Sequence, residues 1–323
     1  MDIMPTPVTL TRESMTELVH CIQRERGATC GWLGAGGIGA FGELVHSSRI
    51  LTNEALNNCR AEVTRQVMGA IREDTRKAIA LVTGVGSEGD PKQWVSKGER
   101  TTRYLASSFY ALFKRFNALI KSLLEETTAL TSRHHGTHWD SDSQHVGDAY
   151  DSISGDAFAD FARLKECTGM ERAFIVGALA LPESCLPQLP ARAYADLIIG
   201  MQQARAYEAA LRTSTPPRLL NLIRAGFDYA PALKAVQDQL LEDFNIAKLR
   251  KELSAEQWFE MSESMHSHLP TPTRIYPARP QPCPPHIPIP HTPARRASPR
   301  NRHQTYGSPH TAACRPGSER AYR

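Results

Sequence analysis

Gln23-Arg24-Glu25-Arg26-Gly27 places a charged side chain where a helix would present its apolar face. Counting back from Arg26 by four, seven, eight and eleven residues meets only apolar side chains, namely Ile22, Val19, Leu18 and Met15. This spacing predicts an amphipathic helix that carries Arg26 on its buried stripe. The rest of the chain can be read as a scaffold that brings a second copy of this arrangement alongside the first.

The second copy is Met170-Glu171-Arg172-Ala173. Arg172 continues an apolar stripe that also contains Phe161, Leu164, Thr168, Ile175 and Leu179. Removing a guanidinium from water is costly unless an anion compensates its charge. The anion could be a carboxylate of the protein, such as Glu25 or Glu171, in a buried ion pair. It could also be a small ligand on which both arginines converge, and the spacing alone leaves both interpretations open.

Four segments carry a resemblance to a known family. They are Leu18 to Gly27 continued by Gly31 to Gly37, Val45 to Asn53, Leu164 to Ala173, and Trp258-Phe259. In this order they resemble the Gln-x-Glu-Arg-Gly, Leu-x-x-x-Arg-x-x-Thr-Asp, Lys-Glu-x-x-Gly-x-Glu-Arg-Ala and Trp-Phe motifs of the nitrate- and nitrite-sensing (NIT) domain family. Val45 and Asn53 replace the Leu and Asp of the second motif. The resemblance covers residues from about 14 to 268.

The resemblance implies a sensor that binds nitrate or nitrite between two helical lobes and signals by rearranging them, without catalysis, cofactor or metal. Arg26 and Arg172 are the expected ligand-binding residues, because planar guanidinium groups can donate paired hydrogen bonds to a planar anion. Arg24 and Arg49 are secondary candidates. Arg24 lies two residues from Arg26 and is expected to face elsewhere on the helix.

Two alternatives follow from the residues themselves. The chain could be an all-helical scaffold that has internally ion-paired arginines and binds a protein partner but no anion. It could also be a metal-binding regulator that uses the His- and Asp-rich stretch between residues 132 and 154, although the spacing there favours a solvated linker.

Helical periodicity predicts an all-α fold of two packed antiparallel bundles. Lobe one spans about residues 11–132, a polar linker follows at 133–154, and lobe two spans about 155–268. Thr11 is the expected N-cap of a helix that runs to about Thr29. Residues 44–85 have a helical pattern whose predicted buried face consists of Val63, Val67, Ile71, Ala78 and Val82. A long helix from about Lys97 to Ser132 carries on one side Tyr104, Phe109, Phe113, Phe116, Ile120 and Leu123.

Charge and proline content separate the two ends of the chain from this body. Residues 270–323 hold nine arginines, no lysine, one acid and thirteen prolines. They contribute +8 to a total net charge of +4, so residues 1–269 carry −4. Such a composition cannot bury enough apolar surface to fold, which predicts a disordered tail at 269–323. Residues 1–10 are interpreted as a flexible leader.

The same reading disfavours several other functions. No apolar run approaches the roughly twenty residues that a membrane-spanning helix needs. Gly34, Gly36 and Gly39 match a dinucleotide fingerprint, but a helix rather than a strand precedes them. The basic tail lacks interleaved aromatic residues, so nucleic acid is disfavoured as a partner. Seven scattered cysteines suit reduced thiols and a cytoplasmic location, and the expected partners are a signalling output protein or a second copy of the chain.

Overall fold

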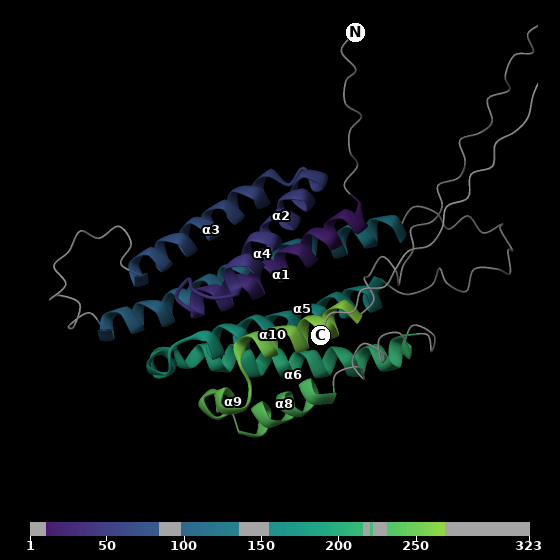
Figure 1. The fold of residues 1–323 in the computed structure, drawn as a ribbon. Coiled ribbons are helices and arrows are strands. Elements are labelled where there is room, and N and C mark those ends of the chain that lie inside the picture. The colour runs from purple at the N-terminus through teal and green to yellow at the C-terminus, as the bar shows by residue number, and fades with distance from the viewer. Residues whose placement is uncertain are drawn as a thin grey trace, which may run out of the picture. The chain divides into compact units, whose positions relative to one another are not determined.

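A computed structural model describes residues 11–83, 98–135, 155–215, 220–221, 231–243 and 245–268. Within these ranges the regular elements are helices and no strand occurs, which confirms the all-α prediction (Figure 1). The predicted leader, most of the predicted linker and the predicted tail lie outside the described residues.

Helix α1 (Arg12–Gly34) begins at the predicted cap. The Thr11 side chain accepts a hydrogen bond from the Ser14 backbone N–H at 3.1 Å, and the Ser14 hydroxyl accepts one from the Thr11 N–H at 3.2 Å. The helix continues beyond the predicted end at Thr29 to Gly34, and in this last part it packs closely against Phe41. A Cβ atom on Gly31 would come within 2.6 Å of the Phe41 ring, so only glycine lets the two helices approach this closely.

Helices α2 (Phe41–Cys59) and α3 (Glu62–Thr83) replace the single helical pattern expected over residues 44–85. Arg60 has a φ of 48°, a left-handed conformation that ends α2. The prediction for Val63 is wrong, since its side chain is 76% exposed. The prediction is confirmed for Ile71 and Ala78, because the buried stripe of α3 consists of Thr64, Met68, Ile71, Thr75 and Ala78.

Helix α4 (Gly98–His135) and helix α5 (Gly155–Ala180) are the two longest. The predicted apolar side of α4 is confirmed for five of its six named side chains, which are buried, but is wrong for Tyr104, whose side chain is 39% exposed. A short 3₁₀ helix, η2 (Glu183–Gln188), leads into α6 (Ala191–Ser214). Pro182 and Pro187 lie in this junction, where proline prevents continuation of an α-helix.

The last part of the described chain forms α8 (Pro231–Glu242), α9 (Ile246–Glu252) and α10 (Ala255–His268). One helix was expected from Pro231 to Leu253, but the Asn245 side chain caps a new helix by accepting from the Lys248 N–H at 2.9 Å. The capping box predicted for the final helix is present. Ser254 and Gln257 exchange side-chain to backbone hydrogen bonds of 2.8 and 3.1 Å.

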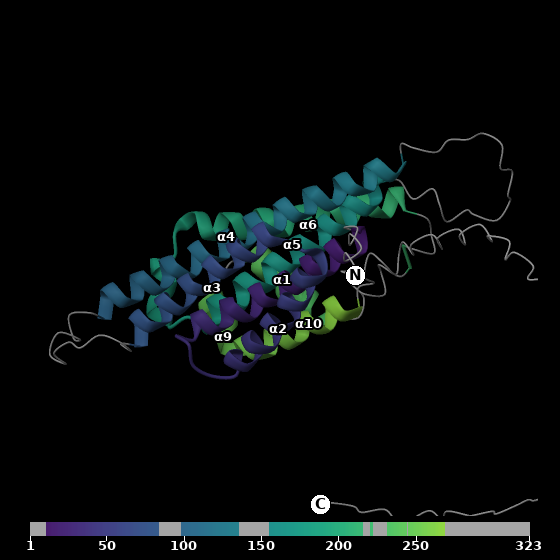
Figure 2. The same cartoon turned by 90° about the horizontal axis from the view of Figure 1, so that it is seen from above.

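Helices α1 and α5 pack against each other and connect the remaining helices (Figures 1 and 2). Helix α1 also packs against α2 and α4, whereas α5 also packs against α4, α6, α9 and α10. The two backbones approach so closely that a Cβ on Gly34 would lie 2.5 Å from the Gly177 carbonyl oxygen. One hydrophobic core runs from Met15 on α1 to Phe259 on α10. The predicted division into two lobes is therefore not confirmed, because α1 and α5 share that core.

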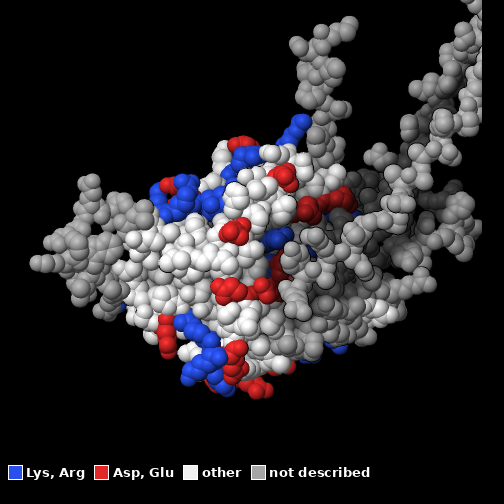
Figure 3. Space-filling model, in the orientation of Figure 1, with Lys and Arg blue, Asp and Glu red and all other residues white. Residues whose placement is uncertain are grey.

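Two further features of the described residues are the distribution of charge on the surface and the apolar character of the helices. On the face shown in Figure 3, basic and acidic side chains are interspersed rather than gathered into fields of one sign. Across the described helices, none has both the length and the apolar character that crossing a membrane would require.

Candidate functional site

The packing of α1 on α5 buries both predicted arginines. Arg26 on α1 has no exposed surface, and Arg172 on α5 is 1% exposed. Repulsion from Arg26 contributes to lowering the pKa of Arg172, although burial is the larger cause. Both guanidinium groups therefore lie where the sequence placed them, on the buried faces of two adjacent helices.

Arg26 is held by groups of the protein. Its Nη1 donates to Glu166 Oε1 at 2.5 Å and to Asn117 Oδ1 at 2.8 Å, and its Nη2 donates to Glu166 Oε2 at 3.3 Å. The Gln23 amide donates to the same carboxylate at 2.7 Å. This is a buried ion pair with additional hydrogen bonds, as the internally paired interpretation required.

Arg172 is less completely paired. Its Nη1 donates to Glu263 on α10, and its guanidinium lies 5.7 Å from the centre of the Phe259 ring. The buried Nε and Nη2 atoms of Arg172 have no hydrogen-bond partner. Leaving two buried N–H donors without a hydrogen-bond acceptor lowers the stability of the fold. The Nε and Nη2 atoms of Arg49 and the Nε atom of Arg26 also lack a partner. Arg172 differs from both because its carboxylate partner, Glu263, is 25% exposed, so Arg172 could exchange that partner for another anion.

Gly27 explains why Arg172 and Phe259 can lie so close to α1. A Cβ atom at this position would lie 3.2 Å from Phe259 Cε2 and 3.6 Å from Arg172 Nε. Trp258 fixes the start of α10 nearby, because its indole N–H donates to the Arg172 carbonyl oxygen at 3.3 Å. The segments that carry the family resemblance on α1, α5 and α10 thus meet in one place.

Arg24 joins this place through Glu263. Its Nε lies 3.8 Å from Glu263 Oε1, and its side chain is 35% exposed. The expectation that Arg24 faces elsewhere needs adjustment, because the carboxylate of α10 reaches both arginines. A single partly exposed carboxylate therefore serves two guanidinium groups.

Arg49 belongs to a different cluster. Its Nε lies 3.5 Å from Glu25 Oε1, and its guanidinium lies 5.8 Å from the centre of the Trp32 ring. Arg72 binds the same carboxylate through two hydrogen bonds of 2.7 and 2.8 Å. Arg49 and Arg72 thus compensate the fully buried Glu25, and the structure does not bring Arg49 together with Arg172.

Lys165 is a basic residue that sequence reasoning did not single out. It is 5% exposed, and no carboxylate within the described residues lies within ion-pair distance. Burial and then repulsion from Arg172 lower the pKa of Lys165 to about 8. Burial and the charges of Lys165, Arg172 and Arg24 lower the pKa of His20 to about 3, so His20 is neutral. We refer to Arg24, Lys165, Arg172 and Glu263 as the Arg172 cluster.

Three other residues of this region were also missed: Glu166, Asn117 and Glu263. Glu166 could have been found, because it belongs to the third motif of the resemblance and is preceded by Lys165. No sequence signal pointed to Asn117 or Glu263, since each depends on how a distant helix packs.

The space beside Lys165 is small. A cavity of about 20 Å³ lies between α1, α4 and α5, where His20, Gln23 and Lys165 contribute to its wall. This volume suits about one water molecule. An anion of several atoms therefore does not fit in this cavity.

The described residues offer little for other chemistry. They contain no group of three or more His, Cys, Asp or Glu side chains that could hold a metal ion, and the His-rich stretch of the predicted linker lies almost wholly outside them. The five cysteines among them are buried and free, and burial raises the pKa of Cys30 to about 12.

Comparison with known proteins gives one match. The family model described as nitrate and nitrite sensing matches residues 17–269. No curated protein matches the chain, and no solved structure matches it.

Proposed function

Since the chain belongs to the nitrate- and nitrite-sensing family, we propose that it binds nitrate or nitrite in the Arg172 cluster and passes the binding event to a signalling partner. The family is one of sensor domains rather than of catalysts. The proposed partner is a signalling output protein or a second copy of this chain.

The observation that carries this proposal is that the positive charges of the Arg172 cluster outnumber its single carboxylate. Arg24 and Arg172 share Glu263, the buried Lys165 has no carboxylate of the described residues within ion-pair distance, and Arg172 keeps two buried N–H groups without a partner. A planar, weakly hydrated anion could accept hydrogen bonds from these N–H groups at a modest desolvation cost. Arg26 then supports the site from α1 through its charge, because its own hydrogen bonds already go to Glu166 and Asn117.

The proposed signal is an exchange of anions on Arg172. Without ligand, Glu263 neutralises Arg172 and Arg24 and holds α10 against α5. A bound anion replaces the Glu263 carboxylate, so the ligand favours an arrangement in which α10 shifts relative to α1 and α5. A ligand shifts such an equilibrium only by its different affinity for the two arrangements. Because α1 and α5 belong to the two predicted lobes, the same event would alter the contact between them.

Thermal unfolding of the full chain tests the binding. Sodium nitrate and sodium nitrite are compared with sodium chloride at equal ionic strength for the wild type, Arg172→Gln and Arg163→Gln. Arg163 is the matched control, because it lies on the same helix and its side chain is 52% exposed. We expect at least one of the two anions to raise the Tm of the wild type and of Arg163→Gln but not of Arg172→Gln.

One observation favours a second function. The Arg26–Glu166 pair is closed within the protein, as a helical scaffold with no anion ligand would require. For such a scaffold, nitrate, nitrite and chloride would change the Tm of the wild type equally.

A further inference from the structure

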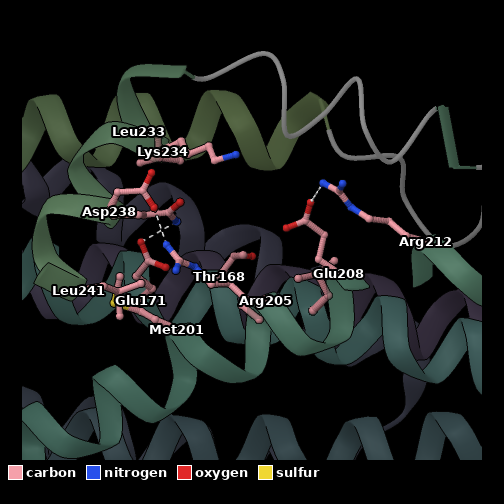
Figure 4. Close-up of a pocket in the computed structure, with 13 residues that line it drawn as sticks. Thr168, Glu171, Met201, Arg205, Glu208, Arg212, Leu233, Lys234, Asp238 and Leu241 are labelled. Atoms are coloured by element: carbon pink, nitrogen blue, oxygen red, sulfur yellow. Dashed lines mark hydrogen bonds and ion pairs between the residues drawn. The ribbon is translucent and has the colours of Figure 1, made fainter. Parts of the chain in front are cut away.

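A second cavity lies between α5, α6 and α8 (Figure 4). Its volume is about 90 Å³, and Leu164, Met201 and Leu233 are among the apolar side chains of its wall. Four charged side chains at its edge are paired with each other, whereas Lys234, which is exposed, forms no ion pair with a described residue. Arg212 donates to Glu208 at 2.5 Å, and Arg205 forms an ion pair with Asp238.

Among the acidic side chains of the cavity wall, Glu171 is the one that lacks such a partner. Its side chain is 3% exposed, and its Oε1 accepts one hydrogen bond from the Gln237 amide at 2.8 Å. No cationic side chain of the described chain lies within ion-pair distance of it. Desolvation by burial raises the pKa of Glu171 to about 7.

Glu25 shows what a buried glutamate receives elsewhere in this protein. It occupies the same position before an arginine, and two guanidinium groups bind it with three contacts of 2.7, 2.8 and 3.5 Å. Glu171 has no guanidinium partner of this kind. It accepts a hydrogen bond from the neutral amide of Gln237 and lines the cavity. A buried carboxylate is stable in its charged form only when a cation compensates it.

The chemistry of the cavity wall narrows the class of cation. One buried carboxylate is too few ligands for a calcium or magnesium ion, which need about six oxygen atoms. An ammonium group carries three donors. Besides the carboxylates of Glu208 and Asp238, which are paired with arginines, the acceptors of the cavity wall are the Glu171 carboxylate, the Gln237 amide oxygen and the Thr168 hydroxyl. The Thr168 hydroxyl donates its own hydrogen to the Lys165 carbonyl at 3.0 Å.

We infer that this cavity binds a small primary alkylammonium compound, with the ammonium group on Glu171 and the alkyl group against Leu164, Met201 and Leu233. The volume limits the ligand to a few heavy atoms, because an engineered cavity of about 150 Å³ accommodates benzene. This site is separate from the Arg172 cluster and takes a ligand of opposite charge, so it does not depend on nitrate binding.

Thermal unfolding and ligand-observed NMR of the full chain test this inference at neutral to mildly alkaline pH. The probes are methylammonium, ethylammonium and propylammonium chloride, with tetramethylammonium chloride as a cation that has no N–H donor. We expect a primary ammonium compound at about 100 times its Kd to raise the Tm by about 5 to 10 °C. Tetramethylammonium at equal ionic strength should leave the Tm unchanged.

Two variants locate the effect. Glu171→Gln keeps the shape of the side chain but removes its charge, so it should abolish the rise in Tm and the NMR signal of binding. Glu208→Gln changes an edge residue that is paired with Arg212 and should keep both. If Glu171→Gln does not fold, the NMR comparison of methylammonium with tetramethylammonium on the wild type still decides. Binding of neither cation, equal binding of both, or binding retained in Glu171→Gln would overturn the inference.

Discussion

Helices α1 and α5 carry the same buried pair, Glu-Arg, but the protein compensates the two copies differently. On α1, two arginines bind Glu25, and Glu166 with Asn117 binds Arg26. On α5, a neutral amide binds Glu171, and a partly exposed carboxylate binds Arg172. The α1 copy is therefore paired more completely by the protein itself, although the Nε atom of Arg26 has no hydrogen-bond partner. We propose that the α5 copy keeps capacity for both an anion and a cation.

This difference assigns separate roles to two arginines that look equivalent in the sequence. A buried ion pair that is closed on both sides fixes the packing of α1 on α5 and leaves little for a ligand to gain. An arginine with two unpaired donors beside a movable carboxylate can exchange its partner. We therefore place the sensing function on Arg172 and a supporting structural function on Arg26.

The largest expected effect on stability comes from removing the carboxylate that pairs with Arg26 on α1. Glu166→Gln leaves the Arg26 charge buried without a carboxylate, so the free energy of unfolding should fall by about 3 to 5 kcal/mol. Glu263→Gln removes the corresponding partner of Arg172, but that carboxylate is 25% exposed and should cost only about 1 kcal/mol. Urea unfolding of both variants measures the two losses. Equal losses would remove the distinction between the two copies.

The next effect concerns pH and the two glutamates. The pKa of Glu171 is raised to about 7 in the folded protein, above its ordinary value, so the folded state holds this proton more tightly than the unfolded state. Its contribution to stability is therefore present at acidic pH and is lost as the pH rises to about 7. Relative to the wild type, Glu171→Gln should gain up to about 3 kcal/mol between pH 4.5 and 7.

Urea unfolding of the wild type, Glu171→Gln and Glu208→Gln across this pH range measures that gain. Glu208 lines the same cavity, but its side chain is 29% exposed and is paired with Arg212. Glu208→Gln should follow the wild type. A constant difference between Glu171→Gln and the wild type would show that Glu171 titrates normally.

Much of this fold follows from local sequence patterns, because the decisive interactions are between residues close in the chain. The cap at Thr11 and the capping box of Ser254 and Gln257 were predicted, and the structure confirms them. The apolar stripe of α4 was predicted for the same reason. Each of these features depends on side chains within a few turns of one helix.

The failures arise where packing between distant segments decides. Val63 lies one residue away from the stripe that α3 buries, and Thr75 takes a buried place because its hydroxyl bonds to the Ile71 carbonyl at 2.8 Å. The extension of α1 to Gly34 depends on its contact with Gly177 of α5. Helical periodicity alone does not contain this information.

The candidate site shows the same division. Periodicity placed Arg26 and Arg172 on buried faces, and the resemblance paired them. Whether each arginine meets a protein carboxylate depended on Glu166 and Glu263, which lie 140 and 91 residues away from their partners. Arg49 was a candidate site residue because it lies in the second motif of the resemblance. In the structure it forms an ion pair with Glu25 and does not lie beside Arg172.

Calorimetric titration of nitrate and of nitrite into the wild type and Glu263→Gln tests the exchange of anions most directly. If Glu263 occupies the place of the ligand, removing its charge removes the competitor. The variant should then bind the preferred anion about tenfold more tightly, which corresponds to about 1.4 kcal/mol. Unchanged or weaker binding in Glu263→Gln would contradict the account, because Glu263 would then not compete with the ligand for Arg172.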